Sequence, residues 1–139
     1  MESHLALFVV VLALVGGCAT TPVRTNVAEP VPSNRVLETR FFTKNDGSGE
    51  LVIKRDAGFS GSACETRIFV DGMPIADIMP SEKVVLHLKD GEHMIGAEPK
   101  SICGGHLAES RVTIKHGNVA TYRVGYGTNG YYFLEPTAF

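Results

Sequence analysis

The sequence lacks several features that would point directly to a function. Its 139 residues include no tryptophan, only three cysteines, and 13 Lys or Arg against 15 Asp or Glu. Because charge is nearly balanced and forms no basic stripe, we expect no nucleic-acid partner. Walker loops, HExxH sequences and dinucleotide-binding fingerprints are also absent from the sequence. Without such a motif, we expect a protein that is not an enzyme and needs no cofactor.

Helical periodicity is also missing from every window of eleven or more residues after the first eighteen. The chain instead has short runs rich in Val, Ile, Thr, Tyr and Phe, separated by glycine-containing turns. Apolar residues alternate within several runs, which places them on one face of a strand. The alternating positions are Ile68 and Val70, Val112 and Ile114, and Tyr122, Val124 and Tyr126. Seven or eight such strands predict an antiparallel β-sandwich or a small barrel over residues 36–139.

Turn residues predict how these strands connect. A Lys-Asp-Gly turn separates the runs 83–88 and 92–98 and predicts a hairpin. A His-Gly-Asn turn joins the runs 109–115 and 119–126 and predicts a second hairpin. Further turns are expected at 71–72 and 127–130, and residues 37–43 read as a first strand.

The one long apolar run lies at the N-terminus, from Leu5 to Val15. As a helix, its eleven residues would span roughly 17 Å, too short for a hydrocarbon core of about 30 Å. This is the length of the apolar region of a signal peptide, and the small residues Gly16 and Gly17 follow it.

The sequence Val15-Gly16-Gly17-Cys18 resembles the lipobox of bacterial lipoproteins. The resemblance implies that residues 1–17 are a signal peptide and that Cys18 carries lipid, such as palmitate, as the first mature residue. Ala19 rather than Asp in the next position implies the outer membrane, with the domain facing the periplasm. Residues 1–4 contain no Lys or Arg, unlike most signals. Ordinary secretion with cleavage nearby and an uncleaved apolar N-terminus are the alternatives.

Residues 18–35 contain three prolines and lack hydrophobic periodicity, so after Cys18 they read as an extended tether. If Cys18 is lipidated, Cys64 and Cys103 remain to form a disulfide, as suits an oxidising compartment. The alternative for Cys103 is a metal site shared with His106, three residues later.

Two wider resemblances follow from the strand region. Residues 68–72 (Ile-Phe-Val-Asp-Gly), together with 84–88 and Gly91-Glu92-His93, are similar to the PEGA-type β-module. Residues 64–139 resemble small proteobacterial envelope lipoproteins of unassigned function. The likeness rests on Cys64, Val70-Asp71-Gly72, Gly91-Glu92-His93, Cys103-Gly104-Gly105, Tyr122-Arg123-Val124 and the Pro136-Thr137-Ala138-Phe139 end.

Two hypotheses about function remain. The first is a lipid-anchored binding or scaffolding module with a protein or glycan partner in the envelope, for which Tyr126, Tyr131 and Tyr132 form a candidate patch. The alternative interpretation of these tyrosines is core packing. The second is a small hydrolase or metal-binding protein that uses His93, His106 and nearby acids. We interpret His93 as a hydrogen-bonded turn residue and keep His106 as a weak metal-ligand candidate.

Overall fold

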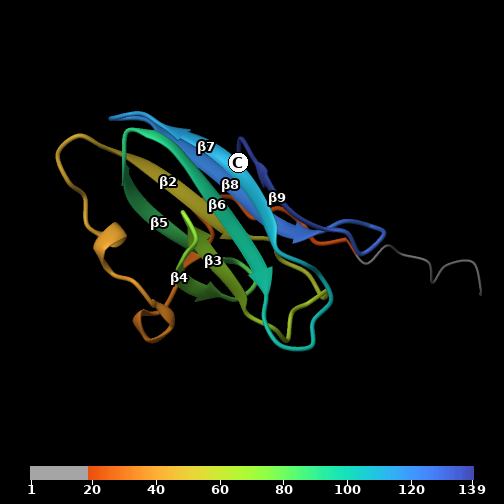
Figure 1. Cartoon of the computed structure of the whole chain (residues 1–139). Helices are drawn as coiled ribbons and strands as arrows, with labels where there is room; N and C mark the ends of the chain where they lie inside the picture. Colours follow the sequence, from red (N-terminus) through yellow and green to blue (C-terminus); the bar gives the residue numbers. More distant parts are fainter. Residues whose placement is uncertain (1–18) are drawn as a thin grey trace, which may run out of the picture.

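The computed structural model describes residues 19–139, and β-strands dominate this part of the chain (Figure 1). Cys18 and the predicted signal peptide lie outside the described residues. The strands are β1 (Glu29–Pro30), β2 (Ser48–Arg55), β3 (Thr66–Val70), β4 (Met73–Ile78), β5 (Glu82–Lys89), β6 (Gly91–Pro99), β7 (Ala108–Ile114), β8 (Val119–Tyr126) and β9 (Tyr132–Pro136). Two 3₁₀ turns, η2 (Ser33–Arg35) and η3 (Arg40–Phe42), precede β2.

The strands form two sheets that pack face to face. One sheet has the order β1-β5-β2-β8-β9 and the other β4-β3-β6-β7. The predicted all-β sandwich is therefore confirmed. The alternative prediction of a small barrel is wrong, because the two sheets stay separate and do not close into a single cylindrical sheet.

Alternating apolar residues from both sheets fill the space between them. All seven alternating positions expected from the sequence are buried, from Ile68 in β3 to Tyr126 in β8. Leu51, Ile53, Leu86 and Ile95 join them with no exposed surface. This burial is the main favourable contribution to folding, at about 25 cal/mol per Å² of apolar area.

The five-stranded sheet is mixed rather than wholly antiparallel. β2 pairs antiparallel with β5 but parallel with β8, from Glu50 opposite Val119 to Arg55 opposite Val124. The parallel pair arises because β2 and β8 both start at the same end of the sandwich, after the connections 43–47 and 115–118. The very short β1 also runs parallel to β5.

Both predicted hairpins are wrong. β5 and β6, separated by Asp90 alone, belong to different sheets, and so do β7 and β8. Each pair is a corner at which the chain crosses from one sheet to the other. The expected turns at 71–72 and 127–130 do join antiparallel neighbours, β3 with β4 and β8 with β9.

Two predictions for the N-terminal segment also differ from the structure. Residues 40–42 form the 3₁₀ turn η3 instead of part of a strand, with Phe41 and Phe42 packed against the core. The expected tether lies against the sandwich from Thr20 onward, and β1 within it adds to the edge of the five-stranded sheet. Pro30 is compatible with this position because an edge strand has a side without ladder hydrogen bonds.

Candidate functional site

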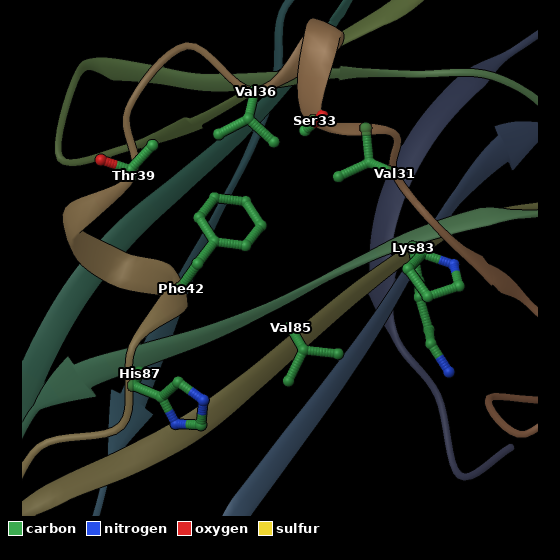
Figure 2. Close-up of a pocket in the computed structure, with 9 residues that line it drawn as sticks. Val31, Ser33, Val36, Thr39, Phe42, Lys83, Val85 and His87 are labelled. Carbon is green, nitrogen blue, oxygen red and sulfur yellow. The ribbon is translucent and has the colours of Figure 1, made fainter.

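A hollow of about 520 Å³ lies between the N-terminal segment and the outer face of β5 (Figure 2). Its volume falls in the range of about 300–1,000 Å³ that small-molecule sites occupy. The segment contributes Pro30, Val31, Ser33, Val36, Thr39 and Phe42, and β5 contributes Lys83, Val85 and His87.

The walls of this pocket are mainly apolar. Figure 2 shows the side chains of Val31, Val36 and Phe42 on the side of the N-terminal segment and Val85 on the opposite side. Lys83 and His87 flank Val85 on the same face of β5, because side chains two residues apart share a face of a strand. The pocket therefore combines apolar contact area with two basic side chains, which suits an apolar ligand that carries an anionic group.

The two basic groups differ in their bonding. Lys83 Nζ donates a hydrogen bond to the carbonyl oxygen of Thr25 at 2.6 Å, which fixes the position of its charge. In residues 19–139 neither ring nitrogen of His87 has a hydrogen-bond partner. His87 can therefore form a hydrogen bond with a bound molecule without breaking one within the protein.

Long-range polar contacts hold the N-terminal wall of the pocket. Arg35 forms a two-fold ion pair with Glu82, with Nη1 at 2.7 Å from Oε2, and the same nitrogen donates to the carbonyl oxygen of Asp77 at 2.9 Å. Burial works to raise the pKa of Glu82, but hydrogen bonds from Arg35 and from Met79 N, with the charges of Arg35 and Arg55, outweigh it and the pKa is lowered. Val31 N also donates to the carbonyl oxygen of Lys83 at 2.9 Å. The wall is thus fixed to the end of β4 and to the start of β5.

His93 links two turns, as expected for a turn histidine. Its Nδ1 lies 2.7 Å from Asp71 Oδ2 and its Nε2 lies 2.8 Å from the carbonyl oxygen of Lys89. Asp71 Oδ1 also accepts a hydrogen bond from Met94 N at 2.9 Å. Both ring nitrogens are therefore engaged within the protein.

His106 lies at the other end of the molecule from His93. His93 is near the start of β6, whereas His106 is in the connection after β6, a strand of nine residues or roughly 30 Å. The His106 ring packs against the rings of Tyr131 and Tyr132, with centroids 5.9 and 6.3 Å apart. The structure therefore does not bring the two histidines into one site.

Cys64 and Cys103 form the predicted disulfide, with Cα atoms 6.1 Å apart. The Cys103 sulfur is therefore not a free thiolate for a metal site with His106. Among residues 19–139 there is no group of three or more His, Cys, Asp or Glu placed to hold a metal ion.

The predicted tyrosine patch is largely core, which is a correction. Tyr126 and Tyr132 are buried, and their rings pack with centroids 5.0 Å apart. Their hydroxyls donate to the carbonyl oxygen of Gly104 at 2.6 Å and to Thr66 Oγ1 at 3.3 Å. Burial raises the pKa of both hydroxyls. Tyr131 is the member of the trio that is exposed.

Sequence reasoning missed the pocket on β5, although β5 contains a signal for it. Val84, Val85 and Leu86 are consecutive apolar residues, so both faces of this strand are apolar at that point. A half-buried strand would alternate, and a continuous apolar run indicates cover on both faces. Of the covering residues, Val31 falls in the predicted tether 18–35 and Phe42 in the predicted strand 37–43, and neither prediction places them over β5.

Comparisons with protein-family models, curated proteins and solved structures gave no match. Within residues 19–139, no helix has the length and apolar character needed to cross a membrane.

Proposed function

We propose that this protein is an exported, lipid-anchored module of the bacterial envelope that binds an amphipathic ligand in the pocket on β5. The observation that carries the binding function is the pocket itself, with apolar walls around Val85 and basic side chains on both sides of it. The ligand class that fits is an apolar molecule with an anionic group. The protein acts by binding and not by catalysis.

The cysteines support the envelope location. Disulfides persist in oxidising compartments such as the bacterial periplasm, and Cys64 and Cys103 are paired with each other. Cys18 is then the cysteine left for lipid, and it stands at the place where the lipobox-like sequence puts the modified residue. Two or more acyl chains on one residue give stable membrane anchoring.

Incorporation of labelled palmitate tests the anchor. The full chain is expressed in a bacterium that processes lipoproteins, beside a Cys18→Ser variant. We expect label in the former and none in the latter. Equal labelling of the two proteins would contradict lipidation of Cys18.

Ligand binding is tested with 8-anilinonaphthalene-1-sulfonate, an apolar anion that fluoresces when it leaves water. Val85→Trp fills the pocket and should weaken binding of the probe by tenfold or more, or about 1.4 kcal/mol. Ile102→Trp is the matched control, because it adds the same ring to a position that is 99% exposed, in the connection after β6 and away from the pocket. Equal affinity of the two variants would show that the probe binds elsewhere and would contradict the proposed site.

A further inference from the structure

The chain is fixed to the sandwich almost immediately after Cys18. Thr20 Oγ1 donates to Asp56 Oδ2 at 2.8 Å and accepts a hydrogen bond from Tyr126 N at 2.8 Å. Thr20 N donates to the Tyr126 carbonyl oxygen at 2.9 Å, and Thr21 pairs with Ala57. Two residues of any chain reach about 7 Å at most, so lipid on Cys18 would be held against this end of the molecule.

Loops from both sheets surround the point where Thr20 is fixed. These loops are 56–65 after β2, 79–81 after β4, 100–107 after β6 and 127–131 after β8. The Cys64–Cys103 disulfide joins the loop after β2 to the loop after β6. The Tyr126 hydroxyl donates to the carbonyl oxygen of Gly104 in the loop after β6. In Figure 1 the connections after β2, β6 and β8 gather at one end of the sandwich. We call this group of four loops the Thr20 end.

The Thr20 end exposes large apolar side chains. Phe59 is 93% exposed, Ile102 is 99% exposed and Tyr131 is 59% exposed, and each lies in a different one of its loops. The backbone next to Phe59 touches the fixed chain, since a Cβ on Gly58 would lie 3.2 Å from the Thr20 Cα. Exposed apolar residues that gather in this way indicate a surface that meets a partner or a membrane.

Charged residues occur at both ends of the sandwich. The charged residues in the four loops of the Thr20 end are paired within the protein: Asp56 is buried and pairs with Arg123, and Glu65 pairs with Lys100. The connections at the opposite end are 43–47, 71–72, 90 and 115–118, and each carries at least one charged residue. A surface with exposed Phe, Ile and Tyr, whose charged groups are paired within the protein, suits the boundary between headgroups and acyl chains, where an unpaired charge would be costly.

We propose that the Thr20 end rests on the lipid bilayer, with Phe59, Ile102 and Tyr131 in the interfacial region. The inference depends on the proposed lipid anchor at Cys18, which would leave one residue, Ala19, between the anchor and the fixed chain. The sandwich then has a defined orientation, with the connections 43–47, 71–72, 90 and 115–118 away from the membrane. The lipid does more than tether the domain, because it sets which loops touch the bilayer.

The absence of tryptophan from the sequence makes a direct test possible, because each introduced tryptophan is the sole one. Phe59→Trp and Ile102→Trp change loop residues whose side chains are almost fully exposed, and His116→Trp, at the opposite end of the sandwich, is the matched control. The full lipidated chain is reconstituted into phosphatidylethanolamine–phosphatidylglycerol vesicles that contain bromine-labelled lipids, which quench nearby tryptophan. We expect quenching at positions 59 and 102 to exceed that at 116 by about twofold or more.

The possible results distinguish a failure of the proposed membrane orientation from a failure of the proposed lipid anchor at Cys18. Quenching at 59 and 102 no stronger than at 116, in protein that carries palmitate, would overturn the orientation and leave the lipoprotein proposal intact. Absence of palmitate from the full chain would overturn both. A far-ultraviolet circular dichroism spectrum unchanged from wild type confirms that each variant is folded.

Discussion

Asp71 and His93 show how single side chains join turns that are distant in sequence. The residues are 22 positions apart, yet the carboxylate of Asp71 receives hydrogen bonds from both the His93 ring and the Met94 backbone. Burial works to raise the pKa of Asp71, but these bonds outweigh it and the pKa is lowered. Burial also works to lower the pKa of His93, and the bonds to Asp71 and to the Lys89 carbonyl raise it overall.

The raised pKa of His93 predicts that stability depends on pH. A histidine with a folded-state pKa above the unfolded value of about 6.5 stabilises the fold below that pH, and this contribution is lost as pH rises through the folded pKa. The free energy of unfolding of wild type should therefore exceed that of His93→Gln by more at about pH 5.5 than at about pH 8.5. Because Asp71 is half exposed, we expect a change of about 1 kcal/mol or less.

Urea unfolding at the two pH values measures this difference. His116→Gln is the control. His116 lies in the exposed turn between β7 and β8, so this substitution makes the same chemical change at a position away from Asp71. A wild-type advantage over His93→Gln that stays constant between the two pH values would contradict the prediction.

At the scale of elements, a buried arginine and the disulfide order the connection between β2 and β3. Arg55 Nη2 donates to the carbonyl oxygen of Gly61 at 2.6 Å, and Nη1 donates to those of Cys64 and Ile78. Burial lowers the pKa of this guanidinium. The Cys64–Cys103 disulfide then ties this connection to the one between β6 and β7. The first connection crosses from the five-stranded to the four-stranded sheet, and the second lies within the four-stranded sheet.

Removal of the disulfide should lower stability substantially. The bond closes a loop across a sequence separation of 39, for which the chain-entropy model gives about 4 kcal/mol. Urea unfolding should show a loss of this order in the Cys64→Ser/Cys103→Ser double variant. Dithiothreitol should lower the stability of wild type and leave the double variant unchanged. Reduction that leaves wild-type stability the same would contradict a stabilising disulfide.

At this scale the sequence predicted where the strands lie but not which strands pair with each other in a sheet. The alternation of Ile68 and Val70, or of Val112 and Ile114, correctly predicted which faces are buried. The same alternation occurs whether two consecutive strands pair in one sheet or face each other across the core, so it could not separate a hairpin from a corner. The turn after β5 was therefore read as a hairpin turn, although the chain changes sheet at Asp90.

For the whole molecule, the N-terminal segment is part of the domain, and this could not be predicted from its composition. Its contacts with the sandwich are made to residues such as Ser81, Glu82 and Tyr126, far along the chain, and local patterns do not report pairings of that range. The pocket was missed for the same reason, since one wall belongs to this segment and the other to β5.

A domain boundary at residue 36, as the sequence suggested, should therefore give a less stable protein than a boundary at residue 19. The fragment 36–139 lacks Thr20, β1 and Arg35, which leaves the buried Asp56 with one partner fewer and Glu82 without its guanidinium. Removing one partner of buried or half-buried charges costs about 1–3 kcal/mol at each place, so we expect a total loss of about 3 kcal/mol or more. Urea unfolding of fragments 19–139 and 36–139 measures it, with the disulfide intact in both. Equal stability would mean that residues 19–35 contribute nothing to the fold, and a lipid at Cys18 would then no longer be held beside Phe59 and Ile102.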